Sequence, residues 1–213
     1  MLAWISAEIG DPTGRRCRQS AWRRTPPTIP DMRFLAVAVV TSLALAVPTA
    51  ALRAPSRIAD FSKAETSWVV VNDGVMGGVS ESRFSQRRGI GTFSGSVRLE
   101  NNGGFASVRS AAALAALRAD ATSFDLRVLG DGRQYRFTVE TGLSWYWFAF
   151  TPPKGKWTTI AAPFDRFQPV TRFGEPTDDA PLRAGATPRR LGILIANGRA
   201  ERFSLQLDWI AIR

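Results

Sequence analysis

The chain has 213 residues with 28 Lys and Arg against 18 Asp and Glu, so its formal net charge is +10. It has no histidine and one cysteine, which excludes a Ser-His-Asp triad, a Cys-His pair, His-ligated zinc or haem, an intrachain disulfide and a thiolate zinc cluster. The hydrophobic fraction of 45% and the charged fraction of 22% are typical of a globular chain.

The first 51 residues carry an Arg-rich extension and then an apolar run. Residues 1–31 show no sustained periodicity and are expected to be an upstream extension outside the domain. Met32 and Arg33 precede an apolar run, Phe34 to Val47, which ends in small residues. This is the pattern of a secretory signal peptide, and the run is short for a membrane span of about 20 residues. Residues 32–51 are therefore predicted to be a signal peptide or, if uncleaved, a membrane anchor helix.

The position of this signal leaves two alternatives open. If Met32 is the true start, the protein is exported to the periplasm or anchored in the membrane through residues 34–51. If the Arg-rich leader is an organellar presequence, the protein is mitochondrial. We favour the first, because targeting patterns of this kind normally begin at the N-terminus. Removing residues 1–51, with their six Arg, three acidic residues and the lone cysteine, leaves a net charge of +7.

Residues 52–60 are predicted to be a linker, and the pattern of residues 61–213 predicts short strands separated by turn residues. Apolar side chains at 124, 126 and 128 and again at 135, 137 and 139 alternate with polar ones around Gly130-Asp131-Gly132, which predicts a β-hairpin. The apolar residues of the last strand switch faces near Asp208, which predicts either a bulge there or burial of both faces of the strand. The other predicted strands are Trp68–Val71, Ser80–Phe84, Gly91–Leu99, Phe105–Arg109, Trp145–Thr151, Trp157–Ala161, Leu191–Ala196 and Phe203–Ile212.

One helix is predicted in this region, over Ser110–Arg118, with Ser110 as its N-cap. Residues Phe173 to Pro188, with three prolines, are predicted to form a long surface loop. Many short strands without βαβ alternation indicate an all-β fold, an antiparallel β-sandwich or jelly roll.

The most specific motif runs from Trp68 to Ser80 and contains Asn72, Asp73 and three glycines within five residues. It lacks the spacing of a dinucleotide fingerprint or a phosphate-binding loop. One interpretation is a bulged connection in which Asn72 and Asp73 cap the turn. The other is that Asn72 and Asp73 belong to a ligand-binding surface.

Two further stretches offer candidate binding residues. Asn101 and Asn102 precede Gly103-Gly104, where left-handed backbone explains the composition, although the amides would also suit sugar hydroxyls. In the run 145–148, Trp145 and Trp147 share one face of a strand. An exposed indole would give a sugar, a lipid headgroup or a protein partner a stacking surface, whereas burial in the sandwich is the alternative.

No pattern assigns a catalytic, metal-binding or cofactor-binding residue. The carboxylates are scattered without a marked pair for glycoside hydrolysis, and no calcium loop of the Asp-x-Asp-x-Asp-Gly type occurs. The basic residues are mostly isolated arginines on strand exteriors rather than a clustered nucleic-acid stripe. The sequence therefore predicts a protein that is not an enzyme, needs no cofactor and does not bind nucleic acid.

Several motifs in this order resemble the complex I intermediate-associated protein 30 (CIA30) family. The resemblance covers roughly residues 61–213 without a large gap. The motifs that carry it are Trp68 with the run 72–80, Phe93-x-Gly95, the run 101–109, Gly130-Asp131-Gly132-Arg133-x-Tyr135, Trp157, Pro163-Phe164-x-x-Phe167, and Phe203-x-Leu205-x-Leu207-x-x-Ile210.

This resemblance implies a galactose-binding-like β-sandwich and a non-catalytic role, since mitochondrial members are assembly factors, or chaperones, that hold intermediates of respiratory complex I (NADH:ubiquinone oxidoreductase). It implies protein partners and brings no catalytic residues. Those members act on the matrix side, whereas an exported domain faces the opposite side of its membrane. The second hypothesis is therefore an exported carbohydrate-binding module that uses Trp145 or Trp147 with Asn101 and Asn102.

Overall fold

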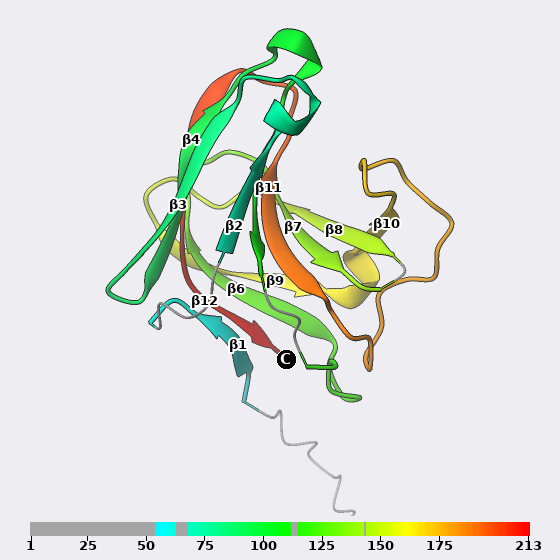
Figure 1. The fold of residues 1–213 in the computed structure, drawn as a ribbon. Coiled ribbons are helices and arrows are strands. Elements are labelled where there is room, and N and C mark those ends of the chain that lie inside the picture. Colours follow the sequence, from blue (N-terminus) through cyan, green and yellow to red (C-terminus); the bar gives the residue numbers. More distant parts are fainter. Residues whose placement is uncertain (1–53, 63–67, 112–114, 143) are drawn as a thin grey trace, which may run out of the picture. The chain divides into compact units, whose positions relative to one another are not determined.

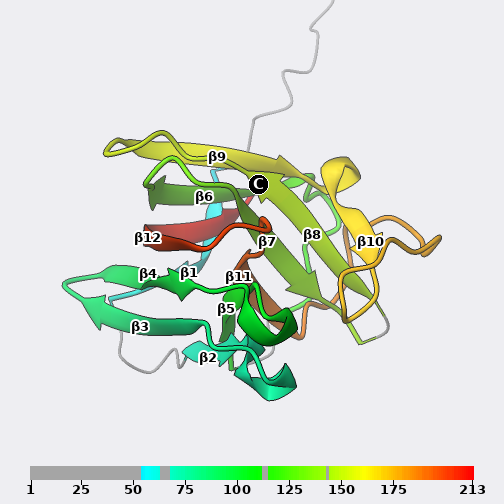
Figure 2. The same cartoon turned by 90° about the horizontal axis from the view of Figure 1, so that it is seen from above.

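Two antiparallel β-sheets face each other in the computed structural model, which describes residues 54–62, 68–111, 115–142 and 144–213 (Figures 1 and 2). The all-β prediction is confirmed. The first sheet has six strands in the order β3-β4-β12-β6-β9, with β1 also paired to β12. These strands are β1 (Ser56–Asp60), β3 (Glu81–Arg87), β4 (Ile90–Val97), β6 (Ser123–Leu129), β9 (Trp157–Pro163) and β12 (Glu201–Ile212).

The second sheet also has six strands, in the order β10-β8-β7-β11-β5-β2. They are β2 (Trp68–Asn72), β5 (Ala106–Ser110), β7 (Tyr135–Glu140), β8 (Trp145–Phe150), β10 (Gln168–Val170) and β11 (Arg190–Ile195). Three short 3-10 helices lie in the described connections: η1 (Asp73–Met76), η2 (Glu100–Asn102) and η3 (Phe164–Arg166). In Figure 1 the turns of η1 and η2 lie together at the top of the view.

Aromatic side chains pack against one another in the core between the sheets. Phe124 of the first sheet meets Phe137 of the second edge-to-face, with ring centroids 5.2 Å apart. Phe93 packs on Phe203 at 4.8 Å, and Tyr135 packs on Phe150 at 6.0 Å. Such rings bury large apolar areas, so they let the sandwich stand without a disulfide among the described residues.

The last strand carries a bulge near Asp208, the first of the two explanations that the sequence left open for its switch of faces. Its pairing with β6 shifts register between Leu207 and Trp209. Odd-numbered residues therefore face the core before the shift, and even-numbered residues face it after the shift. The predicted linker at 52–60 is wrong in its second half, because Ser56–Asp60 form β1 and pair with β12.

The β-hairpin predicted around Gly130-Asp131-Gly132 is wrong. β6 pairs with β12 and β9, whereas β7 pairs with β8 and β11, so the turn carries the chain from one sheet to the other. The alternating pattern reports which face of a strand is buried, and this holds for both strands. It does not report which strand is the hydrogen-bonding partner.

The helix predicted over Ser110–Arg118 is also wrong in its described residues. Ser110 is the last residue of β5, and residues 115–118 are not helical. The backbone of the buried Leu117 bonds instead to a distant loop: its N–H donates to Ala186 and its carbonyl accepts from Gly185. These long-range bonds replace the local ones that an Ala-rich sequence would make in a helix.

The loop predicted over Phe173–Pro188 is confirmed, with one isolated bridge between Val170 and Pro176 at its start. The predicted extension and the signal or anchor segment, residues 1–51, lie outside the described residues. Within the described ranges, no helix is long and apolar enough to cross a membrane.

Candidate functional site

A groove of about 900 Å³ covers the outer face of the second sheet. Strand β8 forms part of the groove floor, because alternate residues of this strand point to opposite faces of the sheet. Trp145 and Trp147 line the groove, Phe148 packs against the core, and Tyr146 is buried although it also contributes to the groove lining. The sequence prediction that some of these rings face outward is confirmed.

Arginine side chains lie on both groove tryptophans. The guanidinium carbon of Arg136 is 4.0 Å from the ring centroid of Trp147, and that of Arg109 is 5.2 Å from the ring centroid of Trp145. These are cation–π contacts, which fix the two planar groups in place. The indole N–H of Trp147 donates to the side-chain oxygen of Gln168 at 3.2 Å, which holds the ring at its edge. The ring faces are therefore partly covered by arginine.

The groove is positively charged. Its nineteen lining residues include Arg109, Arg136, Arg172 and Arg190 but no Asp or Glu. Arg190 forms an ion pair with Glu140 at 3.1 Å. Among the described residues, no carboxylate forms an ion pair with Arg109 or Arg136. Burial lowers the pKa of both these arginines, which nevertheless stay charged because a guanidinium is not deprotonated in proteins.

Exposed apolar side chains form the two rims of the groove. Val75 and Met76 of η1, beside edge strand β2, are 76% and 57% exposed. At the other edge, after β10, Phe173 is 71% exposed and lies under the guanidinium of Arg172 at 4.8 Å. Three large apolar side chains are therefore largely exposed at the margins of the groove.

Asp73 lies next to this rim but is fully buried. One oxygen accepts the backbone N–H of Ser80 at 2.9 Å, and the other accepts the Ser80 hydroxyl at 2.5 Å. The second oxygen also accepts the N–H groups of Gly104 at 2.6 Å and Phe105 at 3.3 Å. Burial would raise the pKa of Asp73, but the hydroxyl of Ser80 and these N–H groups outweigh it and hold the pKa below its ordinary value.

This arrangement explains the two glycine-rich motifs. A Cβ on Gly103 would lie 2.6 Å from a carboxylate oxygen of Asp73, and one on Gly78 would overlap the same side chain. The capping interpretation of the motif at 68–80 is therefore confirmed for Asp73, which ties the connection after β2 to the corner before β5.

The candidate residues of the sequence do not gather in one place. Trp145 and Trp147 line the groove, but Asn72, Asn101 and Asn102 do not. The carbonyl oxygen of the Asn72 side chain accepts the hydroxyl of Ser82 at 2.6 Å. Asn101 and Asn102 are exposed, with φ values of 56° and 57°, the left-handed backbone that their composition indicates.

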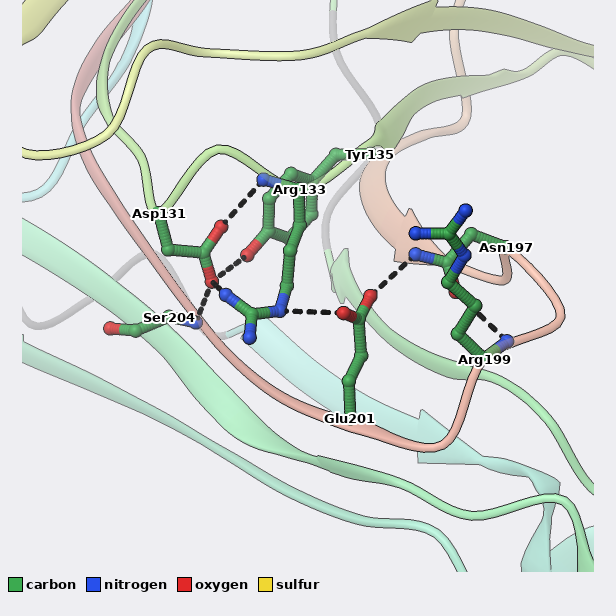
Figure 3. A network of polar contacts seen from close by, with 7 residues as sticks. All are labelled: Asp131, Arg133, Tyr135, Asn197, Arg199, Glu201 and Ser204. Atoms are coloured by element: carbon green, nitrogen blue, oxygen red, sulfur yellow. Dashed lines mark hydrogen bonds and ion pairs between the residues drawn. The ribbon is translucent and has the colours of Figure 1, made fainter.

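A second polar cluster, around Asp131, explains the Gly130-Asp131-Gly132-Arg133-x-Tyr135 motif (Figure 3). Asp131 accepts the Tyr135 hydroxyl at 3.1 Å and the N–H of Ser204 at 2.7 Å, and it pairs with Arg133 at 3.2 Å. Glu201 links Arg133 to Asn197. Burial, and then the charge of Asp131, raises the pKa of Tyr135, so its hydroxyl stays a donor. This cluster joins the turn between the sheets to β12.

The groove residues that sequence reasoning missed are Arg109, Arg136, Arg190, Met76 and Phe173. Strand alternation places the arginines on strand exteriors but does not say that their strands lie in one sheet. The signal for the rims is the position of Val75-Met76 and Phe173 in loops, where large apolar residues are seldom needed for a core. Among the described residues, no group of three or more acidic residues could hold a metal ion.

The fold is that of sugar-binding jelly-roll modules. The family 11 carbohydrate-binding module of the cellulase Lic26A-Cel5E of Clostridium thermocellum superposes with a TM-score of 0.56 at 14% identity, over 75% of this chain and 94% of that one. The same module solved in complex with a β-1,3-1,4-mixed-linked tetrasaccharide gives 0.53 at 13% identity, over 75% and 96%. At these identities the likeness establishes the fold alone.

The sequence motifs assign the family within that fold class. The model of the complex I intermediate-associated protein 30 (CIA30) family matches residues 59–207. The chain therefore belongs to the CIA30 family, and its fold is an antiparallel β-sandwich. No curated protein sequence matches it.

Proposed function

We propose that the chain is a non-catalytic module that holds a protein partner in the groove of the second sheet. Within its family, the finer role is that of an assembly factor for a membrane complex, with intermediates of respiratory complex I as the candidate partner. One observation supports a protein as the partner: Val75, Met76 and Phe173 are exposed on the groove rims. Protein interfaces cover such apolar side chains, whereas a hydrophilic glycan would leave them in water.

The chemistry of the groove supports binding rather than catalysis. Its lining residues offer neither a carboxylate nor a histidine as a general base, and their only cations are arginines, whose pKa is too high for proton transfer at neutral pH. The groove can orient, desolvate and hold a ligand through these groups.

The test is genetic complementation. Deletion of the gene should lower the amount of assembled complex I on native gels and the NADH oxidation of membranes, and the wild-type gene should restore both. A Val75→Asp/Met76→Asp variant should fail to restore them. A Val79→Asp/Leu99→Asp variant, which also places two acids at exposed apolar positions but outside the groove lining, should succeed. Unchanged complex I after deletion would contradict the assembly role.

Glycan binding is the second candidate, and the position of Trp145 and Trp147 in the groove favours it. It ranks second because Arg136 and Arg109 lie on these rings and would have to move before a sugar could stack. Neutral glycans that bind the wild-type chain, and not a Trp147→Ala variant, would establish it. An array without any such glycan would remove it.

We further propose that residues 32–51 direct the domain to a membrane, either as a cleaved signal or as an anchor. A mature N-terminus near Leu52, found by mass spectrometry, would support cleavage and export. A retained Met1 would contradict it. Because complex I assembly on the matrix side needs the opposite topology, this result also decides which partners the groove can reach.

A further inference from the structure

Arg109 and Arg136, the two groove arginines that form no ion pair among the described residues, each contact a tryptophan ring of strand β8. Arg136 lies on Trp147 and Arg109 lies on Trp145. These tryptophans are two residues apart on β8, which places their backbone positions about 7 Å apart on the same face of the sheet. Two tryptophans at alternate positions of β8 thus each hold one guanidinium group on the groove floor.

Gly192 allows Arg109 to reach its position. In the sheet Gly192 pairs with Arg109 on one side and with Thr138 on the other, so it lies between β5 and the tryptophan strand. A Cβ there would come within 2.6 Å of the Thr138 hydroxyl and 3.3 Å of Arg109 Cγ. The missing side chain leaves a path along which the Arg109 side chain crosses the groove floor.

Both guanidinium groups are partly desolvated, and among the described residues neither forms an ion pair with a carboxylate. Their pKa values are lowered by burial, and for Arg109 the neighbouring Arg190 adds to the effect while Glu140 opposes it. A partly buried cation regains the most free energy when a carboxylate binds it through two parallel hydrogen bonds. The tryptophan faces orient the guanidinium groups, so little side-chain entropy remains to be lost on binding.

On this basis, and resting on the proposed protein partner, we propose that the groove binds an extended acidic segment of that partner, with carboxylates at alternate positions for Arg136 and Arg109 and apolar side chains for the rims. Charge complementarity selects the acid, because the lining has four arginines and no acidic residue. The apolar rims select a peptide over an acidic polysaccharide, which has no side chains to cover Met76 and Phe173.

The test starts with a displayed library of random nonapeptides, panned against the full chain. The matched variants each remove two positive charges: Arg109→Gln/Arg136→Gln in the groove, and Arg87→Gln/Arg202→Gln at exposed positions of the first sheet. Wild type and the second variant should enrich peptides with Asp or Glu at alternate positions. The groove variant should not. Thermal denaturation of all three proteins checks that they are folded.

The best enriched peptide is then measured by fluorescence anisotropy beside its copy with Gln in place of both acids. We expect the acidic peptide to bind at least tenfold more tightly than the Gln copy, and the groove variant to lose that preference. Binding should also weaken as salt is raised. Equal affinity for both peptides, loss of binding in the Arg87→Gln/Arg202→Gln variant, or the absence of acidic enrichment would overturn the inference.

Oligogalacturonate, added as a competitor, separates the remaining alternative. If it binds directly, depends on Arg136 and exceeds the peptide in affinity, the ligand is an acidic glycan and the inference is wrong. The proposed function is judged separately by complementation. If Val75→Asp/Met76→Asp abolishes complementation while peptide binding shows no preference for acidic residues, the proposal of a protein partner is retained and only the acidic segment is ruled out.

Discussion

Replacing Asp73 by Asn should destabilise the domain strongly, although the two side chains have the same shape. The carboxylate accepts four hydrogen bonds from Ser80, Gly104 and Phe105. An amide has one oxygen. In its better orientation this oxygen keeps the three bonds from the Ser80 hydroxyl and the N–H groups of Gly104 and Phe105, and the NH₂ group then faces the N–H of Ser80. Hydrogen bonds to a charged group contribute about 1.5–3 kcal/mol each against about 1 kcal/mol for neutral ones.

One lost bond and three weakened ones predict a decrease of at least about 3 kcal/mol in the free energy of unfolding. For a domain of this size that corresponds to a melting temperature lower by roughly 10 °C. The measurement is thermal and urea denaturation of the full chain, followed by circular dichroism. Asp178→Asn, the same change at an exposed residue, is the control and should shift stability by less than about 0.5 kcal/mol.

The pH dependence gives a second check on Asp73. Because its pKa is lowered in the fold, its carboxylate stabilises the protein at pH values above the unfolded pKa, about 3.9. That contribution is lost as the pH falls through the lower folded pKa. The difference in stability between wild type and Asp73→Asn should therefore be full at neutral pH and shrink below about pH 4. A loss equal to that of Asp178→Asn, or one independent of pH, would refute this account of the motif.

Three further substitutions test the fold and the groove. Gly174→Ala should cost about 1–3 kcal/mol and alter tryptophan fluorescence, because Gly174 has a φ of 91° and a Cβ would meet the Trp147 ring at 2.7 Å; unchanged spectra would contradict it. Arg213→Gln should cost about 1–3 kcal/mol in urea denaturation, since it removes the 2.7 Å partner of the buried Asp125 while Arg213 itself is half exposed; no loss would show that water replaces it. Phe137→Ala should cost about 3–5 kcal/mol by leaving a cavity in the core, and a cost below 1 kcal/mol would contradict the packing.

The strands could be predicted from the sequence because alternation is a local property. Phe137 and Val139 alternate with polar neighbours, and they are buried as predicted. Strand partners could not be predicted, since β6 and β7 are neighbours in sequence but belong to different sheets. The predicted helix is wrong at residues 115–118, where the backbone of Leu117 bonds to residues 185 and 186, a long-range contact that local helix propensity does not include.

The candidate site could be predicted only in part, for the same reason. The outward direction of Trp145 and Trp147 follows from parity along one strand. The contacts of Arg136 and Arg109 with these rings depend on the strand order β8-β7-β11-β5, which brings together segments far apart in the sequence. The local pattern predicts that Asp73 caps a turn, but its full burial depends on Gly104 and Phe105, about thirty residues further along the chain.

The central claim is that the groove of the second sheet is the surface on which the partner binds. The most direct measurement places a photo-crosslinking amino acid at Thr138 on the groove floor, and in a second protein at the exposed Ser85 of β3, in cells that make the full chain. The account predicts a crosslink to a protein segment from position 138 and none from position 85. Crosslinks from position 85 alone would contradict it.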